Sequence, residues 1–129
     1  MSIALMVHGG ASSIPAEQSE DYKRGCLAAL EAGWTILERG GSALDAVEAA
    51  IRILEDDPTF NAGRGSALNA DGVVEMDAGI MEGQSLGAGA VAAIQGVRHP
   101  ISVARQVLEN ESVLLVGERR AAFCQRAWR

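Results

Sequence analysis

Two amphipathic helices joined by a very short turn are the feature of the sequence that most constrains the fold. One apolar stripe at helical spacing contains Cys26, Leu30, Gly33, Trp34 and Leu37, and a second stripe of the same period begins soon afterwards. Gly40 and Gly41 separate the two stripes, and glycine readily adopts the left-handed conformation that ends helices. Because so few residues join them, the sequence predicts that the two helices pack in antiparallel orientation.

The second helix has a defined beginning and end in the sequence. Ser42 and Asp45 form an S-x-x-D capping pattern, and acidic residues followed by Pro58 end the helix. Its apolar stripe consists of Leu44, Val47, Ile51 and Leu54.

Short apolar runs elsewhere predict strands, and helical periods predict two further helices. The expected strands are residues 3–7, 73–78, 88–95 and 113–116, and the expected helices begin at Pro100 and span 118–128. A hairpin-like turn is expected at 69–72. Since strands and helices do not alternate one for one, the helices are expected to layer onto a sheet, which indicates an α/β fold.

Charge and cysteine content argue against several classes of function. Eleven basic and seventeen acidic side chains give a net charge of −6, which disfavours a nucleic-acid partner. No apolar run approaches the ~20 residues of a membrane span. Two cysteines, Cys26 and Cys124, are too few for a disulfide framework or a zinc site. A protein of the reducing cytoplasm is therefore expected, without a membrane partner.

Residues 83–87 match the G-x-S-x-G pattern of a serine nucleophile, but the rest of a serine hydrolase is missing. That fold requires an acid and then a histidine after the serine. The only later histidine is His99, and no acidic residue lies between it and Ser85. Ser85 is therefore expected to be a turn residue between two strands.

The segment 54–66 combines a helix end, a run of acidic residues and two glycines. The last carbonyls of a helix lack helical partners and carry partial negative charge, so a curled loop could gather oxygens around a hard cation. Gly63 and Gly65 would allow close approach of backbone or ligand. Residue types alone leave a solvated acidic loop as an equal alternative.

Six short motifs follow one another along nearly the whole chain. They are residues 8–11 (HGGA), 41–47 (GSALDAV), 57–66 (DPTFNAGRGS), 75–78 (EMDA), 87–91 (GAGAV) and 99–105 (HPISVAR). In this order they resemble the plant-type L-asparaginase / isoaspartyl peptidase family of N-terminal-nucleophile hydrolases.

The resemblance implies a four-layer αββα sandwich made from two chains. Members of that family cut themselves into an α chain and a β chain, and the new N-terminal threonine of the β chain is both nucleophile and, through its amine, general base. This sequence resembles the α chain alone, since neither Thr35 nor Thr59 precedes the family's cleavage-site pattern. Residues 1–129 are thus expected to form the α-subunit half of one hydrolase domain, in an (αβ)2 heterotetramer.

The resemblance also assigns roles to particular residues. Asn61 matches the asparagine that helps position the threonine, and Gly9 and Gly10 match a turn near the active site. No catalytic residue is expected in this chain itself. A structural sodium ion is implied, bound through backbone oxygens at positions matching Leu54, Glu55, Asp57, Phe60, Ala62 and Arg64.

The implied activity is hydrolysis of L-asparagine and β-aspartyl dipeptides. A glycosylasparaginase-like amidase would use the same nucleophile on glycosylated asparagine and ranks second. A non-enzymatic binding module is the alternative of a different class, and the absence of a co-purifying second chain would favour it.

Overall fold

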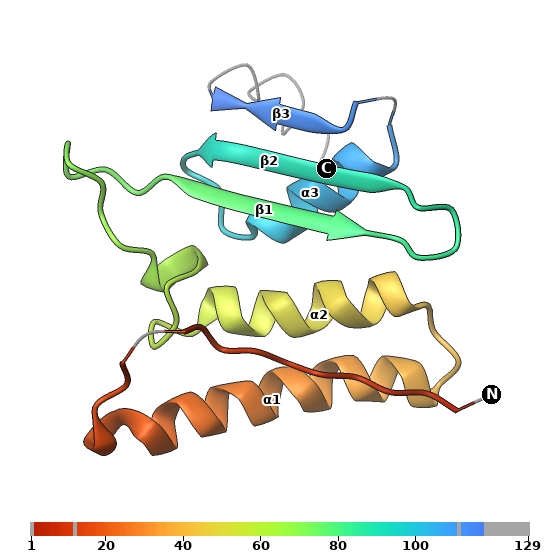
Figure 1. The fold of residues 1–129 in the computed structure, drawn as a ribbon, viewed down its shortest axis with the longest axis horizontal. Coiled ribbons are helices and arrows are strands. Elements are labelled where there is room, and N and C mark those ends of the chain that lie inside the picture. The colour runs from red at the N-terminus through yellow and green to blue at the C-terminus, as the bar shows by residue number, and fades with distance from the viewer. Residues whose placement is uncertain (1, 12, 111, 118–129) are drawn as a thin grey trace. The chain divides into compact units, whose positions relative to one another are not determined.

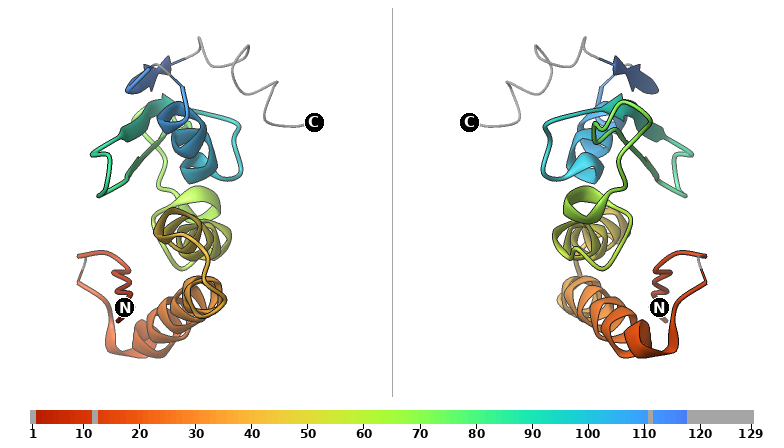
Figure 2. Two further views of the ribbon diagram at one scale, coloured as in Figure 1. Left: turned by 90° about the vertical axis from the view of Figure 1, so that its right-hand side faces the viewer. Right: turned by 90° about the vertical axis from the view of Figure 1, so that its left-hand side faces the viewer.

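The computed structural model describes residues 2–11, 13–110 and 112–117 of the 129-residue chain (Figures 1 and 2). It divides into two compact units, Met1–Gly65 and Ser66–Arg129. The first is helical and the second contains a sheet, so the mixed α/β composition expected from the sequence is confirmed. The helix predicted over 118–128 lies outside the described residues.

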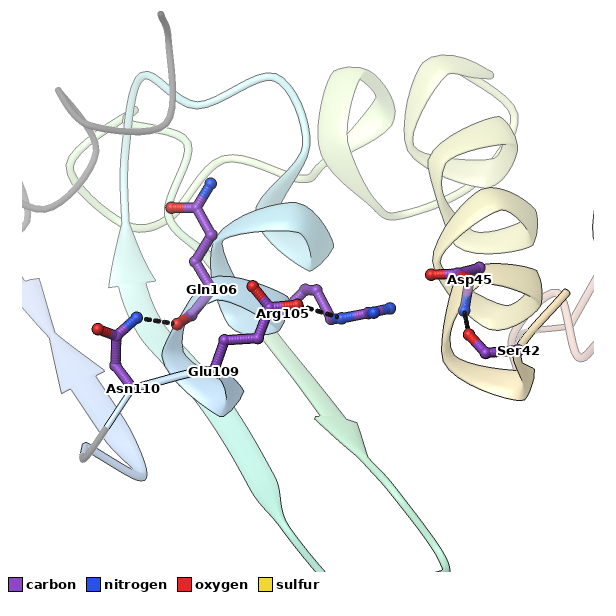
Figure 3. Close-up of polar contacts among 6 residues, drawn as sticks. All are labelled: Ser42, Asp45, Arg105, Gln106, Glu109 and Asn110. Carbon is purple, nitrogen blue, oxygen red and sulfur yellow. Dashed lines mark hydrogen bonds and ion pairs between the residues drawn. The ribbon is translucent and has the colours of Figure 1, made fainter.

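The first unit is built on an antiparallel helix hairpin, as predicted (Figure 1). It consists of η1 (Ala16–Gln18), α1 (Ser19–Glu38), α2 (Ala43–Asp56) and η2 (Gly63–Gly65). Gly40 has a φ of +77° and its amide donates to the Leu37 carbonyl, which ends α1 in the expected left-handed turn. Ser42 Oγ accepts a hydrogen bond from the Asp45 amide at 3.1 Å and caps α2 (Figure 3).

Small residues, Gly33 of the predicted stripe among them, make close contacts between α1 and α2. A Cβ added to Gly33 would lie 2.8 Å from the Ala46 carbonyl oxygen and 3.4 Å from Ala50 Cβ. Ala29 and Ala46 are fully buried, whereas the large residues of the predicted stripes are only half-buried. The backbones approach closely because these positions carry little or no side chain, and the large apolar residues therefore flank the contact.

The predicted strand at 3–7 is wrong for the residues that the structure describes. The segment has no ladder partner there, although its side chains alternate as in a strand. Leu5 and Val7 are half-buried, with Leu5 against Gly33 of α1, while Met6 and His8 are exposed. An apolar run can favour extended backbone, but a strand also requires a neighbour with which to exchange hydrogen bonds.

The second unit is a three-stranded sheet with one helix packed on it (Figure 1). Strand β1 (Met76–Met81) pairs antiparallel with β2 (Ala88–Ile94), and β2 pairs parallel with β3 (Leu114–Val116). Helix α3 (Pro100–Leu108) begins at the predicted proline and connects the two parallel strands. The core between sheet and helix contains Val91, Ile94, Ile101, Val103 and Val107.

Strand β1 begins three residues later than predicted. Asn69 Oδ1 accepts hydrogen bonds from the amides of Asp71 and Val73, each at 3.0 Å, and Gly72 has a φ of +74°. These bonds confirm the turn at 69–72 and draw Val73 into it. The apolar character of Val73 suggested a strand, but the side chain of Asn69 decides its backbone.

No helix within the described ranges is both long and apolar enough to cross a membrane.

Candidate active site

A cavity of about 430 Å³ lies within the first unit, where the N-terminal segment, α1 and the loop after α2 meet. It is lined by His8, Gly9, Gly10, Ala11, Tyr22, Leu54, Phe60, Asn61 and Ala62. The structure therefore brings together three residues that sequence comparison placed near an active site, Gly9, Gly10 and Asn61, although more than fifty positions separate them in the chain.

Asn61 occupies the middle of a tight turn. The Ala62 amide donates to the Phe60 carbonyl at 2.8 Å, which closes a three-residue turn around Asn61. The flanking residues are held in the same way, since the Phe60 amide donates to the Asp57 carbonyl at 3.2 Å and the Gly65 amide to the Ala62 carbonyl at 3.0 Å. Asn61 itself is exposed at the cavity.

The glycine turn at residues 8–10 forms another wall of the cavity. Gly10 has a φ of +117°, a conformation that favours glycine, and its amide donates to His8 Nδ1 at 3.1 Å. This bond assigns His8 a local structural role. His8 directly follows the expected strand at 3–7, and the structure leaves its side chain exposed.

Tyr22 and the aromatic ring of Phe60 were not identified as cavity-lining groups from sequence. Their ring centroids lie 5.4 Å apart with an interplanar angle of 75°, an edge-to-face contact. Tyr22 lies one turn before Cys26 on α1, so the i, i+4 spacing could have placed it on the predicted apolar stripe.

The loop after α2 gathers backbone oxygens, the property expected of a hard-cation site. Pro58 has no amide hydrogen and cannot donate to the Leu54 carbonyl. The Thr59 amide donates to Asp57 Oδ1 at 2.9 Å instead of continuing the helix. A Cβ added to Gly65 would lie 2.7 Å from the Pro58 carbonyl oxygen and would also meet that of Phe60.

Gly63, like Gly65, lies close to a backbone carbonyl oxygen. It has a φ of +52°, and an added Cβ would collide with the Glu55 carbonyl oxygen and lie 2.7 Å from Glu55 Cβ. The side chain of Glu55 is 3% exposed and places a carboxyl group at the end of α2. Within the described ranges no three His, Cys, Asp or Glu side chains are close enough to hold a metal. The polar atoms that crowd Gly63 and Gly65 are the backbone carbonyl oxygens of Glu55, Pro58 and Phe60.

Ser85 is a turn residue, as predicted, and not a nucleophile at a strand-to-helix elbow. It lies in the loop between β1 and β2, where the Glu82 carboxylate accepts hydrogen bonds from the amides of Gln84 at 2.8 Å and Ser85 at 2.6 Å. The hydroxyl of Ser85 and these two amides lower the pKa of Glu82. Ser85 Oγ also accepts from the Gly87 amide at 3.1 Å, so the hydroxyl is committed to the hairpin.

Comparison with known proteins identifies the family of the chain. A family model described as "Asparaginase" matches residues 1–127. The chain is 55% identical over 125 residues to a plant-type L-asparaginase of Pyrococcus abyssi, covering 95% of this chain and 41% of that protein. It is 48% identical over 123 residues to an isoaspartyl peptidase/L-asparaginase of Bos taurus, covering 95% of this chain and 40% of that protein.

A zebrafish relative, the isoaspartyl peptidase/L-asparaginase of Danio rerio, is 46% identical over 122 residues, which cover 94% of this chain and 39% of that protein. The chain thus spans about two fifths of the length of the curated relatives it matches. The family model accounts for nearly every residue, and two of the six motifs on which the resemblance rested, 8–11 and 57–66, contribute residues to the cavity. The chain belongs to the asparaginase family.

Proposed function

We propose that this chain is the α-chain part of an enzyme that hydrolyses β-aspartyl dipeptides and L-asparagine. The observation that carries the proposal is the cavity that both Asn61 and the glycine turn at residues 8–10 line. The activities named for the bovine and Pyrococcus relatives are in keeping with it.

A β chain from the same precursor supplies the nucleophile in this proposal. Its N-terminal threonine attacks the side-chain carbonyl of the substrate, and its own amine accepts the hydroxyl proton and passes it to the nitrogen that leaves as the C–N bond breaks. Water then hydrolyses the resulting ester and releases aspartate. The amide of Asn61 orients the threonine, so this chain contributes positioning rather than a reacting group. The two chains together complete an αββα sandwich and assemble as an (αβ)2 heterotetramer.

Exposed apolar side chains support the need for a partner chain. Met6 is 90% exposed on the N-terminal segment, and Leu27 is 55% exposed on α1. In the second unit Leu68, Leu114 and Val116 are each more than half exposed. Isolated apolar residues are normal at a surface, but an extended segment without a ladder partner and an apolar short strand are both suited to pairing with a further chain.

A structural sodium ion is the second part of the proposal. The carbonyl groups that would hold it belong to Leu54, Glu55, Asp57, Phe60, Ala62 and Arg64. The crowding of backbone oxygens around Gly63 and Gly65 supports this assignment. A bound cation would neutralise the partial negative charge at the end of α2 and stiffen the loop that carries Asn61. A cytoplasmic location also belongs to the proposal and rests on the sequence.

The test is expression of the full-length protein, followed by intact mass analysis and hydrolysis assays with a β-aspartyl dipeptide, L-asparagine and glycosylated asparagine. We expect two polypeptides, the second beginning with threonine, and turnover of the first two substrates. Residues 1–129 expressed alone should be inactive. Hydrolysis by residues 1–129 alone, or preference for glycosylated asparagine, would contradict the proposal.

A further inference from the structure

The aromatic ring of Phe60 is held edge-on between two glycines from different parts of the first unit. A Cβ on Gly9 would lie 2.8 Å from Phe60 Cε1, and a Cβ on Gly25 would lie 2.7 Å from Phe60 Cζ. Real Cβ atoms do not approach so closely, so neither position can carry a side chain while the ring stays in place. Phe60 is 3% exposed, although the residue after it is exposed at the cavity.

Two further contacts fix the ring and its loop against α1. Tyr22 lies one turn before Gly25 and packs edge-to-face on Phe60 at 5.4 Å. Asp57 Oδ2 lies 2.9 Å from the position of a Gly25 Cβ, while Oδ1 of the same carboxylate accepts from the Thr59 amide. The helix therefore contacts the loop on both sides of Thr59. We call Gly9, Tyr22, Gly25 and Phe60 the aromatic clamp.

We propose that the aromatic clamp positions Asn61 and the glycine turn for catalysis, with Phe60 as the positioning residue. Asn61 lies in a turn whose base is the Phe60 carbonyl, so any movement of Phe60 moves Asn61. Gly9 touches the opposite edge of the same ring, so the glycine turn moves with it. This inference rests on the proposed function, because it concerns how the proposed Asn61 is held.

Helix α1 itself offers a control that separates a purely structural role of tight glycine packing from a role in positioning Asn61. Gly33 lies on the same helix and is also crowded, since its Cβ would lie 2.7 Å from Leu5 Cδ2 and 2.8 Å from the Ala46 carbonyl oxygen. The nearest neighbours of this Cβ are Leu5, Ala46 and Ala50, none of which belongs to the aromatic clamp. Gly33→Ala is therefore a control for Gly25→Ala with the same substitution in the same helix, directed at the contacts with α2 and Leu5.

The experiment uses the full-length enzyme at constant sodium chloride concentration. The comparison uses three single variants, Gly25→Ala, Gly33→Ala and Phe60→Leu. It also uses two double variants, in which Phe60→Leu is combined with one of the two glycine substitutions. The measurements are kcat and KM for a β-aspartyl dipeptide, the melting temperature, and hydrogen exchange of the Ala62 amide. We expect Gly25→Ala to lower kcat by about ten- to hundredfold with little change in KM, since misplacement of a positioning group acts on the transition state.

The double variants carry the decisive result. Gly25→Ala with Phe60→Leu should be no slower than Phe60→Leu alone, because the added methyl group no longer displaces a ring. Gly33→Ala should lower the melting temperature, leave kcat and Ala62 exchange nearly unchanged, and combine independently with Phe60→Leu.

Several results would overturn the inference. A folded Gly25→Ala enzyme with unchanged kcat would overturn it. The same conclusion would follow if Gly25→Ala and Gly33→Ala each lost kcat in proportion to the decrease in melting temperature. If Gly25→Ala does not fold, Phe60→Leu alone gives the same test, because this substitution adds no atoms to the packed interface. Unchanged kcat and unchanged Ala62 exchange in the Phe60→Leu enzyme would also count against the aromatic clamp. An inactive wild-type enzyme would refute the proposed function instead, and Ala62 exchange would then still report on the aromatic clamp.

Discussion

Asn61 is the residue through which this chain would act most directly on the reaction. Its side-chain amide lies at the cavity, and the hydrogen bond from Ala62 to Phe60 fixes the turn beneath it. Asn61→Ala is expected to slow both self-cleavage and turnover of the full-length enzyme. Loss of one positioning hydrogen bond corresponds to about 1–3 kcal/mol. Mass analysis of the processing time course and steady-state kinetics are the measurements.

A second asparagine provides the control for that substitution. Asn110 Nδ2 donates to the Gln106 carbonyl at 2.6 Å at the end of α3 (Figure 3). Asn110 belongs to the second unit, whereas the residues that line the cavity belong to the first. Asn110→Ala should leave processing and turnover at wild-type rates. Normal rates in both variants would remove Asn61 from the site.

The hairpin between β1 and β2 contains a carboxyl group, that of Glu82, with a lowered pKa. The Ser85 hydroxyl is the largest cause of the lowered pKa of Glu82, ahead of the amides of Ser85 and Gln84. A carboxyl group with a lowered folded pKa stabilises the hairpin at neutral pH, and that contribution is lost as the pH falls through the folded pKa. In Ser85→Ala the pKa of Glu82 should rise toward its ordinary value of 4.5.

Titration of the Glu82 carboxyl by NMR measures this shift directly. Turnover of the full-length Ser85→Ala enzyme should be unchanged, because the hydroxyl serves only the hairpin. An unchanged pKa would contradict the role given to the hydroxyl, and abolished turnover would revive a serine nucleophile.

The contact between β2 and α3 depends on a single glycine. A Cβ on Gly89 would collide with the backbone at Leu108 and Ala104, whereas a Cβ on Gly79 of the paired strand would meet nothing closer than 3.9 Å. Gly89→Ala should destabilise the protein by about 1–3 kcal/mol, the usual effect of overpacking. Gly79→Ala should change stability by less than that. Thermal or denaturant unfolding of the two variants is the measurement, and equal stability would contradict the packing.

Elements set by local signals were predictable, and those set by distant partners were not. Gly40 and Ser42 mark the helix hairpin with backbone and capping chemistry that acts within a few residues, so its boundaries followed from sequence. The segment at 3–7 is apolar enough to predict a strand, but no neighbour pairs with it among the described residues. The site shows the same division, because the role expected for Asn61 came from a motif and stays a prediction, while the contact between Phe60 and Gly9 joins residues more than fifty positions apart and has no local signal.

The proposed sodium site belongs to the scale of the whole folded protein, because its proposed ligands are spread over residues 54–64 and require the folded loop after α2. An ion that binds only the folded state stabilises it by RT ln(1 + [L]/Kd), about 2.7 kcal/mol at a hundredfold excess over Kd. The full-length enzyme should therefore melt at a higher temperature in sodium chloride than in choline chloride of equal ionic strength. Equal ionic strength matters because salt also screens the surface charges.

Substitutions of two glycines in the first unit test whether the sodium-dependent difference in melting temperature comes from the loop after α2. Gly63→Ala places a methyl group against the Glu55 carbonyl oxygen at a φ of +52°, so it should abolish the sodium-dependent difference in melting temperature. Gly40→Ala introduces comparable backbone strain at a φ of +77°, but nothing lies within 4 Å of the added atom. That variant should melt earlier in both salts and keep the difference between them. Identical melting of the wild-type enzyme in the two salts would show that the segment is an ordinary acidic turn.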